Sequence, residues 1–274
     1  MKLVHLLAVA TLVSGSILLQ SCCEKPKTES EKPVVENHAG DYLHQAVLWY
    51  QLSGEMQACS YQAFNLAKTA LVANVKADKS PLKKAVILDI DETLLDNSPF
   101  MAEMSINHNE FSPELWEEWS KMEKAVALPG AVDFIRFALE NNVEVFYVSN
   151  RLDSELQWTL NNMKALGFPE IPAERFYLKT TTSDKKMRRD SIMQNYSVVL
   201  FIGDNLADFS NDFDDRKTDY AKGAVDANAA LFGTRYVIIP NPTYGGWEKP
   251  LYDKSETPKF EQRRKLMISY EDLK

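Results

Sequence analysis

The chain has 274 residues, of which 45% are hydrophobic, and carries a formal net charge of −8 at pH 7. This length and apolar content are enough to bury a full hydrophobic core. The negative charge argues against a nucleic-acid polymer as partner, because proteins hold such polymers mainly through a basic surface. A small anionic substrate would have to meet a local positive site.

The first 21 residues have the pattern of a lipoprotein signal peptide. Lys2 precedes an apolar run over residues 3–19, and the run ends in Leu19-Gln20-Ser21-Cys22. A small residue before Cys22 resembles a lipoprotein cleavage site, although Gln20 replaces the usual small residue. We predict Cys22 as the lipid-modified N-terminus, with an uncleaved anchor or modification of Cys23 as the alternatives. This predicts a location in the bacterial cell envelope, with the lipid anchor expected in the outer membrane and the protein facing the periplasm or the surface.

Two segments follow before the first predicted strand. Residues 22–40 are rich in Lys, Glu and Pro, which predicts a disordered tether that cannot form a core. Residues 41–77 have an amphipathic pattern typical of a helical pair. We expect one domain over residues 41–274.

Two aspartates follow the most apolar strand pattern of the chain. Val86-Ile87-Leu88 leads directly into Asp89-Ile90-Asp91. Residues i and i+2 of a strand point to the same side, so Asp89 and Asp91 are expected to project together from its carboxyl end. Paired carboxylates there require a cation or a proton as compensation, and a divalent metal is the simplest candidate.

Two simpler interpretations of these aspartates compete with a metal site. A calcium-binding loop needs Gly at its sixth position, where this chain has Leu94. A turn in which Asp91 or Thr93 caps a helix remains open at this segment. The rest of the chain has to decide between the capping turn and a catalytic site.

Further apolar runs alternate with helical patterns along the chain. The expected strands are residues 85–88, 143–148, 176–178, 198–202 and 236–239. A hydroxyl, a Lys or an Asp follows the end of each of the first four. Right-handed crossovers would bring these polar residues to one edge of the sheet. The pattern predicts an α/β fold with a doubly wound parallel sheet.

Four segments, in this order, resemble the motifs of a known family. Asp89-Ile90-Asp91-Glu92-Thr93-Leu94-Leu95-Asp96-Asn97-Ser98 resembles motif I of the haloacid dehalogenase (HAD) superfamily. The other three are Phe146-Tyr147-Val148-Ser149-Asn150-Arg151, the region from Phe176 to Arg188, and Phe201-Ile202-Gly203-Asp204-Asn205-Leu206-Ala207-Asp208-Phe209. The longer first string narrows the resemblance to the class C acid phosphatases, the lipoprotein e family. The similarity spans roughly residues 41–250 and implies a Rossmann-like parallel sheet sandwiched by helices, with a helical cap.

The resemblance also implies roles for individual residues. Asp89 would be the nucleophile, and Asp91 the acid and later the base. Mg²⁺ would be held by Asp89, by the backbone carbonyl of Asp91 and by Asp204, with Asp208 orienting metal-bound water. Ser149 and Lys185 would bind the phosphoryl oxygens. Ser149 replaces the Thr that we expect in the bacterial members, and Lys186 is the alternative to Lys185.

Substrate choice is expected in the cap, which we place at about residues 41–77 and 97–128. Trp116 and Tyr244 occupy the places at which the family stacks the base of a nucleoside monophosphate, and Asn150 is a further candidate substrate contact. Aromatic residues at helical spacing also occur in cores, so both interpretations remain open for Trp116 and Tyr244.

The expected activity is that of a lipid-anchored, Mg²⁺-dependent acid phosphatase and 5′-nucleotidase that acts on phosphomonoesters through an aspartyl-phosphate. The alternatives are a phosphotransferase on the same fold and a non-catalytic binding or storage protein. Retention of Asp89, Asp91, Lys185 and Asp204 argues against the storage protein. The resemblance leaves a homodimer open.

Overall fold

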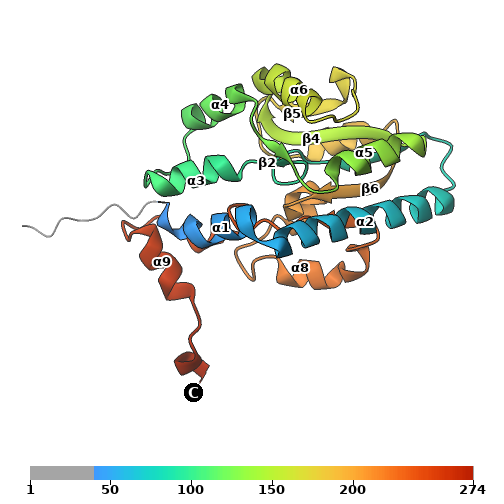
Figure 1. Ribbon diagram of the computed structural model, residues 1–274. Helices are drawn as coiled ribbons and strands as arrows, with labels where there is room; N and C mark the ends of the chain where they lie inside the picture. The colour runs from blue at the N-terminus through green and yellow to red at the C-terminus, as the bar shows by residue number, and fades with distance from the viewer. Residues whose placement is uncertain (1–39, 274) are drawn as a thin grey trace, which may run out of the picture. The chain divides into compact units, whose positions relative to one another are not determined.

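The computed structural model describes residues 40–273, which are built around a parallel β-sheet (Figure 1). The five strands lie in the order β5–β4–β1–β6–β7, and every neighbouring pair is parallel. Their bounds are Lys84–Leu88 (β1), Glu144–Leu152 (β4), Phe176–Lys179 (β5), Ser197–Gly203 (β6) and Tyr236–Ile238 (β7). The predicted α/β fold with a parallel sheet is confirmed.

Helices cover both faces of the sheet. The α-helices in the described part of the chain are His44–Leu52 (α1), Gly54–Ala77 (α2), Ser98–Ile106 (α3), Pro113–Met122 (α4), Ala131–Glu140 (α5), Leu156–Ala165 (α6), Lys186–Met193 (α7), Lys222–Ala227 (α8) and Lys259–Leu266 (α9). None of the helices within residues 40–273 is both long enough and apolar enough to cross a bilayer.

Alternation along β1 distributes its side chains between the two layers of the core. Val86 and Leu88 are fully buried in the cluster that contains the apolar faces of α2 and α5. Ala85 and Ile87 point to the opposite face, in the cluster that contains Ile192 of α7. Burying each large aliphatic side chain stabilises the fold by roughly 2 kcal/mol. The strand is thus fixed from both sides, and the loop that follows it starts from a rigid support.

A helical insertion follows β1 and is closed by a short strand pair. Strand β2 (Leu95–Asp96) is antiparallel to β3 (Val126–Ala127), and α3 and α4 lie between them in sequence. The first turn of the described chain, η1 (Asp41–Leu43), and α1 pack against α3. Leu43, Val47, Phe100, Met101 and Met104 form the small core of this helical module.

The predicted cap requires a correction within residues 41–77. Helix α2 does not join the module around α3, because it packs along the sheet against β6 and against α5. Ser53 caps the start of α2 by accepting the Met56 amide at 3.0 Å, and Phe64 and Leu71 are buried in the main core. An amphipathic pattern indicates a buried face but not the partner of that face. Of the predicted cap residues 41–77, those over 41–52 pack against α3.

The predicted signal peptide over residues 1–21, the lipid site Cys22 and the tether up to residue 39 lie outside the described residues.

Candidate active site

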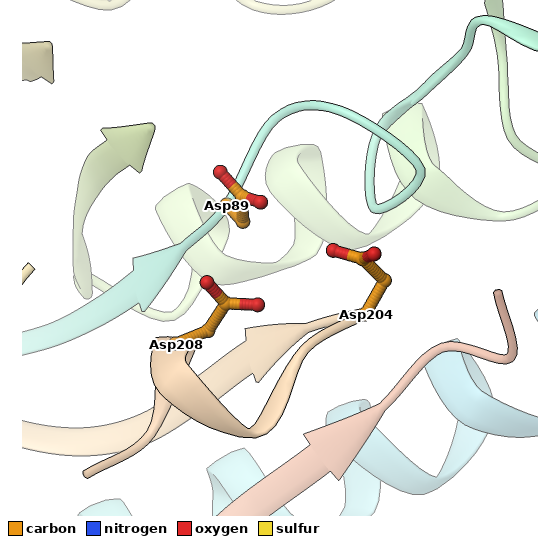
Figure 2. A group of neighbouring side chains, drawn as sticks. All are labelled: Asp89, Asp204 and Asp208. Atoms are coloured by element: carbon orange, nitrogen blue, oxygen red, sulfur yellow. The ribbon is translucent and has the colours of Figure 1, made fainter. Parts of the chain in front are cut away.

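Three carboxylates converge at the carboxyl edge of the sheet (Figure 2). Asp89 follows β1, Asp204 follows β6, and Asp208 lies on the 3-10 turn η4 (Leu206–Asp208). One oxygen from each side chain lies within 4.8 Å of the other two. Asp89 and Asp208 are buried and Asp204 is half-buried. The crossovers of the sheet therefore bring together residues that are more than a hundred positions apart in sequence.

A close backbone approach makes this arrangement possible at the end of β6. A Cβ atom on Gly203 would lie 2.3 Å from Oδ2 of Asp208. The same Oδ2 accepts the backbone N–H of Asn205 at 2.9 Å. Because any side chain at position 203 would displace the Asp208 carboxylate, Gly203 is required for the turn that presents it.

Lys185 lies between two of the carboxylates. Its Nζ is 2.8 Å from Oδ1 of Asp89 and 2.6 Å from Oδ1 of Asp208, and its side chain is buried. The alternative lysine, Lys186, lies on the surface in an ion pair with Asp190. Of the two lysines, Lys185 is the one that the structure brings to the carboxylates.

Two of the three carboxylates, Asp89 and Asp204, have raised pKa values. Burial raises the pKa of Asp89 to about 7, with Lys185 opposing the rise and Asp208 and Asp91 adding to it. Burial, together with the charges of Asp208 and Asp89, raises the pKa of Asp204 well above its ordinary range. Lys185 alone does not neutralise the cluster. Three acidic side chains with excess negative charge supply the hard oxygen donors that a divalent metal prefers, so these residues fit such an ion.

The side chain of Asp91 points to a different set of partners. Its Oδ1 accepts from Nε and Nη2 of Arg151, at 3.0 and 2.8 Å, and from Nδ2 of Asn97, at 2.9 Å. Asp91 is absent from the carboxylate cluster within residues 40–273. This geometry leaves the backbone of Asp91, rather than its side chain, for the predicted metal contact.

The predicted phosphate-binding hydroxyl lies within the last part of β4, which continues to Leu152. Ser149 is fully buried, and its Oγ accepts the Arg151 amide at 3.1 Å. The guanidinium of Arg188 donates to the Ser149 carbonyl and, at 2.7 Å, to Oδ1 of Asn150. The same guanidinium group donates to the Asp184 carbonyl at 3.2 Å. Arg188 thus joins the strand end that carries Ser149 to the loop that carries Lys185.

A buried acid lies directly beside the aspartate pair. Glu92 adopts a left-handed backbone conformation with φ 52° and accepts the Asn97 amide at 2.9 Å and the hydroxyl of Tyr244. Burial, and next the charge of Asp91, raises the pKa of Glu92 to about 8. Sequence reasoning assigned no role to Glu92, although its position inside Asp89-x-Asp91-Glu92 was a usable signal.

Two cavities meet at these residues. The larger, about 740 Å³, is lined by Asp89, Ser149, Lys185, Asp204 and Asp208. The second, about 500 Å³, has mostly apolar walls that include Phe100, Met101, Met104, Phe111 and Trp116. Asp91, Asn150 and Tyr244 line both. Of the predicted substrate residues, Asn150 and Tyr244 therefore lie at the boundary between the charged cleft and the aromatic cavity, and Trp116 lines the aromatic cavity.

The two predicted base-stacking residues differ in their surroundings. Trp116 donates its indole N–H to Glu155 at 2.9 Å, and its ring meets Phe100 edge to face at 5.2 Å between centroids. Tyr244 is held through its hydroxyl by Glu92. Trp116 is tied into the helical module, whereas the ring of Tyr244 borders both cavities.

Comparisons with known proteins agree with this geometry. Residues 10–247 match the family described as HAD superfamily, subfamily IIIB (acid phosphatase). The class C acid phosphatase from Bacillus anthracis is 36% identical with a TM-score of 0.78, and the match covers 84% of this chain and 98% of that one. The tungstate-bound form of the same enzyme is likewise 36% identical, with a TM-score of 0.79 over the same shares of both chains.

More distant curated relatives come from plants. A stem 31 kDa glycoprotein of Glycine max is 27% identical over 132 residues, which are 46% of this chain and 52% of the relative. Vegetative storage protein 1 of Arabidopsis thaliana is 26% identical over 134 residues, 46% of this chain and 49% of the relative. Acid phosphatase 1 of Solanum lycopersicum is 22% identical over 180 residues, 64% of this chain and 68% of the relative. The chain spans about half the length of the first two.

The raised carboxylate pKa values predict how stability depends on pH without metal. The folded chain holds protons on Asp89 and Glu92 up to about pH 7 and about pH 8, whereas the unfolded chain releases them near the ordinary values of 3.8 and 4.5. Between these pH values the folded state binds more protons than the unfolded state. The contribution of the two groups to the free energy of unfolding is therefore complete below about pH 4 and is lost as pH rises through about 8. Each group contributes at most about 1.4 kcal/mol per pH unit.

Urea unfolding in EDTA at several pH values measures this effect. The Asp89→Asn variant should lose less unfolding free energy than the wild type between about pH 4 and 7, because it lacks one of the titrating groups. Equal losses in the two proteins would contradict the raised pKa of Asp89.

Proposed function

The chain belongs to subfamily IIIB of the HAD superfamily, the acid phosphatases, and from this premise we propose that it is a Mg²⁺-dependent hydrolase of phosphomonoesters that uses Asp89 as nucleophile. The observation that carries the proposal is the ion pair between Asp89 and buried Lys185 at the base of the 740 Å³ cleft. A carboxylate next to a fixed cation is suited to approach an anionic phosphoryl group, which it would otherwise repel.

The first chemical step uses residues at the ends of β1 and β4. A carboxylate oxygen of Asp89 attacks phosphorus, an O–P bond forms, and the bond to the leaving oxygen breaks with its electron pair on that oxygen. Lys185 and the hydroxyl of Ser149 bind the phosphoryl oxygens, since both line the same cleft. Asp91 gives its proton to the leaving alkoxide, which departs as an alcohol.

The second step returns the enzyme to its starting state. Asp91, now a carboxylate, takes a proton from water while the water oxygen attacks phosphorus. The bond to Asp89 breaks, and inorganic phosphate leaves. One residue acts first as acid and then as base, which requires that it border the leaving-group side of the cleft. Asp91 lines both cavities.

The proposed cofactor is Mg²⁺, held by Asp89, Asp204 and the backbone of Asp91, with Asp208 beside it. The converging carboxylates and the raised pKa values of Asp89 and Asp204 support a divalent cation at this place. When bound, the ion supplies positive charge that offsets the repulsion between the incoming phosphate and the carboxylates.

The proposed substrates are 5′-nucleoside monophosphates. The 500 Å³ cavity opens beside Asp91, the residue that would protonate the leaving group, and aromatic and Met side chains form its walls. Such walls fit the flat base of a nucleoside leaving group. Tyr244 is the proposed stacking residue, Trp116 forms the opposite part of the wall, and Asn150 borders the phosphate side.

Attachment to the bacterial outer membrane through a lipid on Cys22 is part of the same proposal and is supported by the sequence pattern Leu19-Gln20-Ser21-Cys22. The homodimer stays a prediction.

Two other functions are tested by the same experiment. A phosphotransferase would pass the phosphoryl group from Asp89 to an acceptor alcohol instead of water. A storage role is suggested by the plant relatives vegetative storage proteins 1 and 2. The presence of Asp89, Lys185 and Asp204 in one cleft supports catalysis over storage.

A phosphate-release panel tests the proposed activity. The substrates are AMP, glycerol phosphate, a sugar phosphate and p-nitrophenyl phosphate, each at acid pH with Mg²⁺ or with EDTA. We expect phosphate release that requires the metal and is fastest on AMP. Release of alcohol in excess of phosphate when glycerol is added would identify transfer, and no turnover of any substrate would favour the storage protein.

Asp89→Asn tests the nucleophile. The amide is nearly the same size as the carboxylate but cannot attack phosphorus, so kcat should fall at least about a thousandfold, about 4 kcal/mol in the barrier. Far-UV circular dichroism should show a folded protein. If the variant retains a tenth of the wild-type rate, Asp89 is not the nucleophile.

Tyr244→Ala tests the proposed stacking of a base. Loss of the ring should weaken transition-state binding of AMP by about 1–3 kcal/mol, as calculated from kcat/KM. The value of kcat/KM for glycerol phosphate, which has no ring to stack, should change little. Tyr244→Phe is the matched control, because it keeps the ring and removes the contact with Glu92. Any loss in this control should be equal on both substrates. An equal loss on both substrates in Tyr244→Ala would indicate a structural role for the ring.

Cys22→Ser tests the lipid anchor. Because a diacylated cysteine is the proposed attachment, the variant should be released from membranes as a soluble, active enzyme or accumulate as an unprocessed precursor. Membrane fractionation with mass spectrometry of the N-terminus measures this. A processed variant that still sediments with membranes like the wild type would refute the lipoprotein proposal.

A further inference from the structure

Arg151 makes the most extensive contacts to the aspartate that handles the proton. It lies near the end of β4 and is 3% exposed. Its Nε lies 3.0 Å from Oδ1 and 3.2 Å from Oδ2 of Asp91, and its Nη2 lies 2.8 Å from Oδ1. Because two nitrogen atoms of the guanidinium donate to the Asp91 carboxylate, they fix its plane as well as its position. A single hydrogen bond would not fix the plane.

Asn97 supplies a third hydrogen-bond donor to the Asp91 carboxylate. Asn97 donates from Nδ2 to Oδ1 of Asp91 at 2.9 Å, and its own Oδ1 accepts the indole N–H of Trp119 at 2.8 Å. Oδ1 of Asp91 therefore receives three hydrogen bonds from Arg151 and Asn97, whereas Oδ2 receives a single contact at 3.2 Å. The asymmetry leaves Oδ2 as the oxygen with capacity to exchange a proton with a leaving group.

Arg151 is itself held on its other sides. Its Nη1 donates to Oγ1 of Thr159 on α6 at 3.1 Å. Its Cζ lies 5.6 Å from the ring centroid of Trp116 on α4. Glu155 fixes that ring by accepting the indole N–H at 2.9 Å, and its other oxygen accepts the backbone N–H of Leu152, next to Arg151. The guanidinium is thus immobilised by the sheet layer and by the helical insertion together.

We propose that Arg151 is the positioning residue for Asp91: it holds the carboxylate in the orientation that delivers a proton to the leaving oxygen, and Trp116 and Thr159 hold Arg151. This inference rests on the proposed phosphatase activity and adds a residue to which no role has been assigned. Arg151 does not line the 740 Å³ cleft where phosphorus would bind but does line the leaving-group cavity. Its effect should therefore appear in the departure of the leaving group and not in the binding of phosphate.

The dependence of rate on the leaving group separates this role from a purely structural one. Arg151→Met keeps an unbranched apolar stem and removes all donors. We expect kcat/KM to fall about 100-fold for glycerol phosphate, whose alkoxide needs a proton, and by no more than about threefold for p-nitrophenyl phosphate, whose phenolate does not. The ratio of the two values does not depend on the fraction of folded enzyme. If Arg151→Met does not fold, Arg151→Gln, which keeps a polar amide, serves for the same comparison.

A double-mutant cycle with Asp91→Asn shows whether Arg151 acts through Asp91. In the Asp91→Asn background, Arg151→Met should leave the ratio for the two substrates unchanged, because the group that it orients is gone. Arg175→Met is the matched control: Arg175 is a partly buried arginine paired with Glu144 at 3.0 Å, remote from the cleft. Arg175→Met should leave the ratio of kcat/KM for the two substrates at the wild-type value.

The outcomes are distinct. Equal losses on both substrates in Arg151→Met, or an undiminished change of the ratio in the Asp91→Asn background, would overturn the positioning role while leaving the phosphatase intact. A wild-type protein that releases phosphate from neither substrate would refute the proposed function itself and the positioning role with it. A selective loss on glycerol phosphate that disappears in the Asp91→Asn background establishes the role.

Discussion

The placement of one ammonium group between two buried carboxylates is the interaction on which the site depends. Two like charges about 4 Å apart repel by about 4 kcal/mol at an effective dielectric near 20, and Asp89, Asp204 and Asp208 come within 4.8 Å of one another. Lys185 offsets part of this repulsion by touching Asp89 and Asp208 at once. Burial raises the pKa of Asp89, the charges of Asp208 and Asp91 add to the rise, and the excess negative charge makes the site receptive to a second cation.

The fold supplies the rigidity that such a charge cluster needs. Strands β1 and β6 are adjacent and buried on both faces, so Asp89 and Asp204 start from supports that cannot relax apart. Gly203 lets the following turn fold back until Asp208 meets Lys185. Arg188 draws the lysine-bearing loop against the end of β4. The strands and the side-chain contacts thus fix the positions of the same groups, the carboxylates and the ammonium group of the site.

The strands and the order of the site residues were predictable because they depend on local patterns. Apolar runs of four to six residues mark buried strands, and polar residues at their ends must gather at one edge of a parallel sheet. The partner of α2 was not predictable, since an amphipathic stripe fits a sheet as well as another helix. The orientation of Asp91 was also hidden, because it depends on Asn97 and Arg151, which lie 6 and 60 positions away. The role of Lys185 over Lys186 rested on family spacing until the three-dimensional contacts separated them.

The short pair of strands β2 and β3 has a consequence for how this architecture can diversify. Because Leu95–Asp96 and Val126–Ala127 are hydrogen-bonded neighbours, the chain leaves and re-enters the sheet layer through a closed neck. Helices α3 and α4 lie beyond that neck, but Asn97 lies directly at it and donates to Asp91 at 2.9 Å. The insertion therefore serves both substrate choice and catalysis, because it lines the leaving-group cavity and also carries Asn97 and Trp116, which contact Asp91 and Arg151. A graft of another insertion between Asp96 and Val126 should alter what the enzyme accepts, and it should preserve the chemistry only where it replaces the contacts of Asn97 and Trp116.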